Sequence, residues 1–159
     1  MLSALALGVC LMLPSNATVV DPFRAPECAR CAGNRGIEYA LPPNSPVYSG
    51  LRGQVVYVGT VARVQYVVVR ASADARVRVT YGGLGDVVVV RGDVVRRSDV
   101  LGTAAALHVG VRVGEEYVDP LTLTHGANAT GGGSVGAPAA PRYRVTLGRG
   151  TTVGCVRNP

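Results

Sequence analysis

Cysteine is the residue type whose spacing in this chain suggests chemistry most directly. Four cysteines are present, and Cys28 and Cys31 form a C-x-x-C pattern. A structural zinc site needs four ligands, but neither a second C-x-x-C nor a nearby pair of histidines accompanies this pattern. A redox motif needs a strand-to-helix setting, which the surrounding sequence does not provide. For an exported protein we therefore predict one disulfide, joining Cys155 to Cys28 or Cys31.

Short strands are the elements that the rest of the chain predicts. Hydrophobic residues make up 48% of the sequence, Trp is absent, and Val dominates. Val favours strands because its branched side chain packs well on a pleated surface. In the first strand, alternation puts Val55 and Tyr57 on the same face. The fold class is therefore all-β, with strands predicted at 54–59, 65–70, 76–81, 87–90, 107–113 and 116–118 and turns at 50–53, 91–93 and 114–115.

Composition divides the chain into four parts. Residues 1–17 are an apolar leader, whose stretch 2–13 has the length of the apolar region of a signal peptide and is too short to span a bilayer. Export would remove it together with Cys10, and the alternative is a buried first strand or helix. The β domain covers 18–124, and residues 14–46 are expected to form an extended arm with few regular elements. A Gly/Ala/Pro-rich linker at 125–141 and a tail at 142–159 follow.

The types of basic and aromatic residue in the chain, and their distribution, exclude two classes of function. The net charge is +6, and all sixteen basic residues are Arg. These arginines form no run, and seven Tyr and one Phe leave little for base stacking, so we predict no nucleic-acid partner. A polyanionic wall or a membrane surface would attract the same charge, although a merely solvated basic surface accounts for it as well. The absence of Lys excludes lipoyl and biotinyl carrier domains, which need an acceptor lysine.

Five blocks of sequence stand in a set order along the chain. They are NRGIEYA at 34–40 with PPNSPV at 42–47, GQVVYVG at 53–59, RGDVV at 91–95 with DVLG at 99–102, LHVGVR at 107–112, and YVDPL at 117–121. Together they resemble the lysostaphin/LytM-type peptidoglycan metallopeptidases, from about Pro22 to Leu123, and look closest to a shorter actinobacterial branch. The resemblance implies an antiparallel β-sandwich or barrel-sandwich hybrid, the duplicated hybrid motif.

The zinc site that the resemblance implies is degraded in this chain. In that family a His, an Asp four residues later and the second His of a His-x-His pattern hold the metal, with a fourth position open for water. These positions fall on Asn34, Glu38 and His108, and only His108 keeps its type. Glu38 carries one methylene more than Asp, and the Asn34 amide is a poor zinc ligand.

The catalytic positions of the family are altered as well. The first residue of His-x-His falls on Ala106, which can neither give nor take a proton. The other catalytic histidine is expected near Arg70 or Gly82, and neither of these can act as a neutral base. Because losing one general base costs about 10²–10⁴ in rate, the resemblance implies a domain without peptidase activity.

The predicted function is therefore a catalytically inactive LytM-like domain, exported to the cell envelope. It would bind peptidoglycan, or regulate a cell-wall amidase or other hydrolase, through a groove lined by Asn34, Arg35, Glu38 and His108. No cofactor is expected unless the degraded site still binds zinc. The alternatives are a zinc metalloendopeptidase that cuts peptidoglycan cross-links with an altered site, and a structural envelope protein. Considered without the neighbouring motifs, His108 would be interpreted as an ordinary core histidine. Glu38 would likewise be interpreted as a solvated carboxylate beside Arg35.

Overall fold

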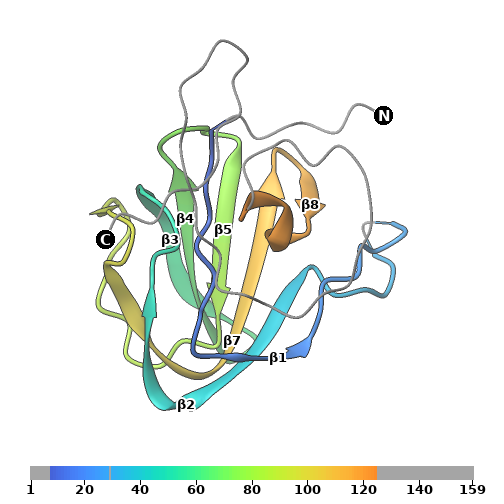
Figure 1. Cartoon of the computed structure of the whole chain (residues 1–159). Coiled ribbons are helices and arrows are strands. Elements are labelled where there is room, and N and C mark those ends of the chain that lie inside the picture. The colour runs from blue at the N-terminus through green and yellow to red at the C-terminus, as the bar shows by residue number, and fades with distance from the viewer. Residues whose placement is uncertain (1–7, 29, 125–159) are drawn as a thin grey trace.

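The computed structural model describes residues 8–28 and 30–124. The regular structure in this part is almost entirely antiparallel β-sheet, so the predicted all-β class is confirmed (Figure 1). The elements are β1 (Thr18–Asp21), β2 (Gly36–Tyr48), β3 (Gly53–Val61), β4 (Val64–Ala71), β5 (Val77–Gly82), β6 (Val94–Val95), β7 (Val100–Val113), β8 (Glu116–Val118) and a 3₁₀ turn η1 (Pro120–Leu123). No helix within these ranges is long and apolar enough to cross a membrane.

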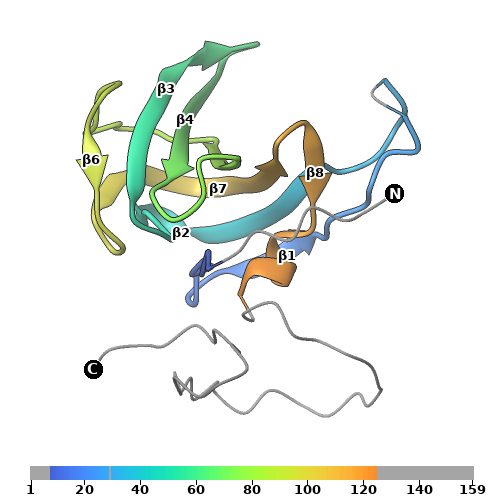
Figure 2. The same cartoon turned by 90° about the horizontal axis from the view of Figure 1, so that it is seen from above.

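The strands form one sheet in the order β1-β2-β7-β5-β4-β3-β6, and β8 pairs with β7 as a hairpin. The two long strands β2 and β7 run alongside each other through the middle of the molecule. The β3–β4 hairpin rises near one end of β7 and the β8 hairpin near the other (Figure 2).

Alternate residues of the central strands form the core. Successive side chains of a strand point to opposite faces, so one face is buried and the other carries polar residues. A shift of one residue in any strand would reverse its faces, so the valines of the core also determine where the polar residues point. The buried set, each member 4% exposed or less, comprises Ile37, Tyr39, Val67, Val69, Val77, Val79, Tyr81, Leu107, Val109, Val111 and Val113.

The predicted extended arm at 14–46 is wrong, because it contains β1 and most of β2. Pro42 and Pro43 suggested irregular structure, since proline cannot donate a hydrogen bond to a ladder. In the structure they lie where the pairing of β2 with β7 shifts register, between Ala40 and Ser45, and the strand continues beyond them. The predicted strand at 87–90 is also absent, since this segment is irregular and Val88 and Val90 are each 65% exposed.

A bulge in β3 corrects the predicted alternation. Val55 pairs with Val69 and Tyr57 pairs with Val68, so Val56 is the extra residue between them. A bulge of this kind moves the following side chains to the other face. Val55 is therefore buried at 1% exposure while Tyr57 is 40% exposed, and the two do not share a face.

The disulfide within the described residues also differs from the prediction. Cys28 is bonded to Cys31 rather than to Cys155, which lies outside these residues. A backbone hydrogen bond from Cys31 N to Cys28 O, 3.1 Å long, closes a tight turn and brings the two Cα atoms to 4.9 Å. This separation is within the range that disulfides span. The C-x-x-C pattern therefore closes its own loop.

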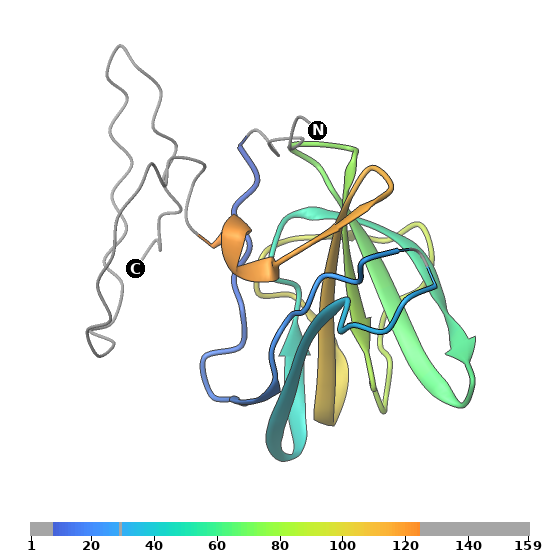
Figure 3. The same cartoon turned by 90° about the vertical axis from the view of Figure 1, so that its right-hand side faces the viewer.

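The N-terminal segment, residues 8–17, packs against the domain. Val9 and Leu11 are 5% and 2% exposed and belong to the core. Leu11 N donates to Leu123 O at 3.0 Å, and Met12 N donates to Gly50 O at 2.8 Å. Figure 3 shows the segment running past η1. The alternative of a buried segment thus matches the structure, although as irregular chain, and cleavage of a leader at 17 stays a prediction.

Candidate functional site

Glu38 and His108 are brought together by the pairing of β2 with β7. The two residues are direct cross-strand partners, and both point away from the core. Glu38 Oε1 lies 2.5 Å from Nδ1 of His108, and the two side chains are 40% and 24% exposed respectively. The pair is therefore formed at a half-open surface, and each group satisfies one hydrogen-bonding position of the other.

Glycines make the room for the His108 ring. A Cβ added to Gly36 would lie 2.6 Å from Cε1 of this ring, and one added to Gly110 would lie 2.9 Å from its Nε2. Real Cβ atoms do not approach ring atoms this closely, so only glycine at these positions lets the imidazole lie over the backbone. Since Gly36 and Gly110 are cross-strand partners, they form one small-residue patch beside His108.

Asn34 is used to hold the chain in place. Its side chain is 8% exposed, and Nδ2 donates to Pro22 O at 3.1 Å and to Asp21 O at 3.3 Å. Its Oδ1 accepts a hydrogen bond from Gly36 N at 3.3 Å. Both ends of the amide are thus engaged with backbone, and they tie the segment after β1 to the start of β2.

Arg35 lies against an aromatic ring that the sequence reasoning did not single out. Its guanidinium is 5.6 Å from the centre of the Tyr117 ring on β8 and donates to Cys31 O at 3.4 Å. Of the four residues predicted to line a groove, the structure therefore joins Glu38 and His108, while Asn34 and Arg35 have their principal contacts elsewhere. A common groove for all four stays a prediction.

Two positions predicted to replace catalytic histidines, Ala106 and Gly82, lie next to His108, and neither side chain can transfer a proton. Ala106 is its neighbour along β7 on the same face, and Gly82 is its partner on β5. A Cβ at Gly82 would lie 2.5 Å from Cε1 of Tyr66, so the Tyr66 ring covers this glycine. A tyrosine opposite a glycine in adjacent strands is the signal that could have identified Tyr66 once the register was known.

The residues present do not fit a three-ligand zinc site. Zinc is held by imidazole, thiolate and carboxylate groups, and three protein ligands are the usual catalytic set. Within residues 8–28 and 30–124, no three His, Cys, Asp or Glu side chains lie together in a way that could hold a metal ion. Glu38 and His108 supply two donors, and the residue predicted for the third position, Asn34, offers an amide oxygen that already accepts from Gly36 N.

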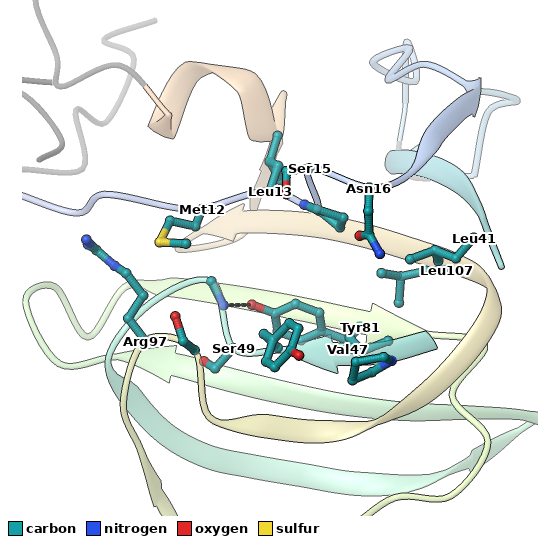
Figure 4. Close-up of a pocket in the computed structure, with 15 residues that line it drawn as sticks. Met12, Leu13, Ser15, Asn16, Leu41, Val47, Ser49, Tyr81, Arg97 and Leu107 are labelled. Carbon is teal, nitrogen blue, oxygen red and sulfur yellow. Dashed lines mark hydrogen bonds between the residues drawn. The ribbon is translucent and has the colours of Figure 1, made fainter. Parts of the chain in front are cut away.

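A cavity of about 770 Å³ lies on the opposite side of the sheet from His108. It opens between the N-terminal segment and the core face, and Tyr81, Leu107 and Val47 contribute to its floor (Figure 4). The Tyr81 hydroxyl accepts a hydrogen bond from Gly50 N at 2.8 Å. Burial raises the pKa of Tyr81 to about 12, so this hydroxyl stays protonated at neutral pH. Because it lies on the core side of the sheet, the cavity is separate from the Glu38–His108 pair.

A comparison with known families identifies the class of protein to which this chain belongs. The sequence model of peptidase family M23 matches residues 32–120, which is more than half of the chain. The chain therefore belongs to peptidase family M23. No curated protein matches the chain in sequence.

Solved structures confirm the predicted lysostaphin/LytM-type fold. The catalytic domain of the antimicrobial peptidase lysostaphin from Staphylococcus simulans aligns with a TM-score of 0.60 at 17% identity, over 69% of this chain and 92% of that one. A catalytic-domain mutant of the prophage-encoded M23 protein EnpA from Enterococcus faecalis gives 0.59 at 19%, over 72% and 96%. A chain of the SpoIIQ–SpoIIIAH pore-forming complex gives 0.63 at 20%, over 73% and 91%. At these identities the likeness is one of fold.

Proposed function

We propose that this chain is a non-hydrolytic M23 domain of the cell envelope that binds the peptide part of peptidoglycan. The observation that carries the proposal is the Glu38–His108 pair, formed by two residues that the family resemblance assigns to zinc binding, with no third ligand beside them in the described part of the chain. Peptide hydrolysis by this family needs a metal-activated water and a base. The resemblance assigns the third ligand position to Asn34, whose amide is bonded to backbone, and the first position of His-x-His to Ala106.

The same face is suited to holding a peptide. Glu38 and His108 are half-exposed, and the His108 imidazole lies over the backbone at Gly36 and Gly110, which carry no side chains of their own. An extended peptide lying there would meet the polar Glu38–His108 pair at one point and the Tyr66 ring, which covers Gly82, next to it. Binding sites of this kind use a few polar groups for orientation and apolar contact for area.

The relatives support a place in the cell envelope. Lysostaphin is called an antimicrobial peptidase, and the SpoIIQ–SpoIIIAH structure is called a pore-forming complex. The net charge of +6 suits a negatively charged wall. A protein partner, such as a cell-wall amidase, is the second candidate, and the likeness to a chain of a two-protein complex favours it.

Cosedimentation with purified peptidoglycan, with zinc and cleavage measured on the same samples, tests the proposal. We expect the chain to sediment with the wall, to carry far less than one zinc, and to release no peptide fragments detectable by mass spectrometry. His108→Gln should reduce sedimentation. Arg63→Gln, at the exposed tip of the β3–β4 hairpin, is the control and should not.

Two results would overturn this assignment. One zinc per chain that is lost in His108→Ala, together with cleaved cross-links, would make the domain a metalloendopeptidase with an altered site. No sedimentation of the wild-type chain, combined with capture of a purified cell-wall amidase, would move the function to the second candidate.

A further inference from the structure

Three arginines lie side by side across the sheet, on neighbouring strands and in register. Arg70 on β4 pairs with Arg78 on β5, and Arg78 pairs with Arg112 on β7. We call these three residues the arginine row. At one end Arg70 pairs with Gln54 on β3, and at the other Arg112 pairs with Tyr117 on β8. The row therefore crosses the middle of the sheet.

The row lies on the same face as Glu38 and His108. The neighbours of each arginine along its strand, such as Val69, Val77 and Val111, are completely buried in the core, so the arginines point to the opposite side. Adjacent strands are about 4.8 Å apart, so the three Cα atoms span roughly 10 Å. Like charges directly opposite in a sheet destabilise it, which makes this arrangement costly without a counter-charge.

The protein supplies little of that counter-charge. Arg70 donates to the neutral Oε1 of Gln54 at 2.8 Å. Arg112 is paired with Glu115, whose side chain is 90% exposed, and its guanidinium lies 5.2 Å from the Tyr117 ring. Within the described residues the side chain of Arg78 has no hydrogen bond or ion pair, and the buried Nε of Arg112 has no acceptor. The row thus presents more positive charge than its surroundings neutralise.

A strip of small side chains connects the row to the Glu38–His108 pair. Arg112 and His108 are four residues apart on β7, which is about 13 Å at roughly 3.3 Å per residue. Between them Gly110 is flanked by Thr80 on β5 and Gly36 on β2. An extended segment of about four residues would cover this distance and would end at the His108 ring, which lies over Gly36 and Gly110.

We propose that the arginine row binds the carboxylates of an acidic peptide whose backbone continues along β7 to the His108 ring. Guanidinium and carboxylate groups form paired, charge-assisted hydrogen bonds, and arginine suits this geometry better than lysine. A line of guanidiniums about 10 Å long fits carboxylates spread along an extended chain better than a single phosphate. The inference rests on the proposed function for its His108 end, whereas the row itself can be tested alone.

Calorimetric titration with short synthetic peptides tests the row. The probe is a five-residue peptide containing two glutamates, the comparison peptide carries glutamines instead, and inorganic phosphate is titrated separately. We expect the acidic peptide to bind and the glutamine peptide to bind at least about tenfold more weakly. Arg78→Gln should weaken the acidic peptide by about tenfold, and Arg78→Lys should restore part of that loss, because the charge returns without the planar fork.

Arg63→Gln removes the same charge away from the row and should change affinity less than about twofold. An equal loss in Arg63→Gln and Arg78→Gln would overturn the proposal in favour of diffuse attraction. Phosphate binding as tight as the peptide would overturn the choice of ligand. The unfolding temperature of Arg78→Gln should not fall, since the variant relieves like-charge repulsion, and this separates lost binding from lost fold.

The two proposals fail in different ways. Arg78-dependent binding of the free acidic peptide, without sedimentation on peptidoglycan, would leave the row standing and reject the wall as the ligand. Sedimentation that depends on His108, with no binding of the acidic peptide, would reject the row alone.

Discussion

The two faces of the central strands are built under different constraints. On the core face, valines and aromatic residues are almost completely buried and are covered by Val9 and Leu11 of the N-terminal segment. On the other face, His108 and Glu38 are half-exposed, and the Arg78 side chain has no hydrogen bond or ion pair within the described residues. Because successive residues serve opposite faces, residues of the polar face can differ between proteins of one fold without disturbing the core. The sheet is therefore evidence for the family and says little about hydrolysis.

The largest effect is expected on the covered side. Leu11→Ala should lower the free energy of unfolding by about 2–5 kcal/mol, because it removes a core side chain and leaves a cavity. Met12→Ala, next to it and 37% exposed, is the matched control and should cost under about 1 kcal/mol. Urea unfolding measures both. Equal free energies of unfolding for the two variants would mean that the segment is not part of the folded unit. This is the result expected if residues 1–17 are a leader that is cleaved off.

The next effect belongs to the glycines of the open face. Gly36→Ala should cost about 1–3 kcal/mol, because its Cβ would lie 2.5 Å from Val109 O, a backbone atom that cannot move away easily. It should also move the His108 ring, visible as a change in the imidazole NMR signals. Gly85→Ala, whose nearest contact is the Thr103 hydroxyl at 3.1 Å, should leave those signals unchanged. Unchanged His108 signals in both variants would contradict the conclusion that Gly36 makes room for the His108 ring.

A third effect is expected on the core face, where alkaline pH should lower the stability. Burial raises the pKa of Tyr81 to about 12, and burial together with Asp119 does the same for Tyr39. The unfolded chain loses these protons near pH 10, so stability is complete below that value and falls as pH rises towards 12, by up to about 1.4 kcal/mol per unit for each tyrosine.

Tyr81→Phe should remove part of that alkaline fall while costing about 1–2 kcal/mol at neutral pH, since Gly50 N loses its acceptor. Urea unfolding between pH 8 and pH 11 measures both quantities. An unchanged slope in the variant would show that Tyr81 is not the group that titrates late.

The smallest effect is expected at the Glu38–His108 pair. Both side chains are substantially exposed, and pairs of this kind stabilise proteins by under about 1 kcal/mol. A double-mutant cycle of Glu38→Gln and His108→Gln should give a coupling energy within that limit. A coupling of several kcal/mol would mean that the pair belongs to the core after all, and would undo the contrast between the two faces.

Much of the fold could be predicted from sequence. The alternating valines of β5 and the hairpin at β7–β8 were identified correctly, because period-two burial is a local pattern. The order of short motifs also predicted the family. Residues 14–46 were misassigned because Pro42 and Pro43 look like loop residues, and only the register of β2 against β7 shows that a strand continues past them.

Motif order alone identifies the residues that the resemblance assigns to zinc binding and catalysis, which are Asn34, Glu38, Ala106 and His108. The tertiary structure decided their partners. Pairing across strands is non-local, so only the folded chain joins Glu38 to His108, turns Asn34 to the carbonyls of Asp21 and Pro22, and closes Cys28 on Cys31. The arginine row has the same origin: its members are far apart in sequence and become neighbours only through strand register.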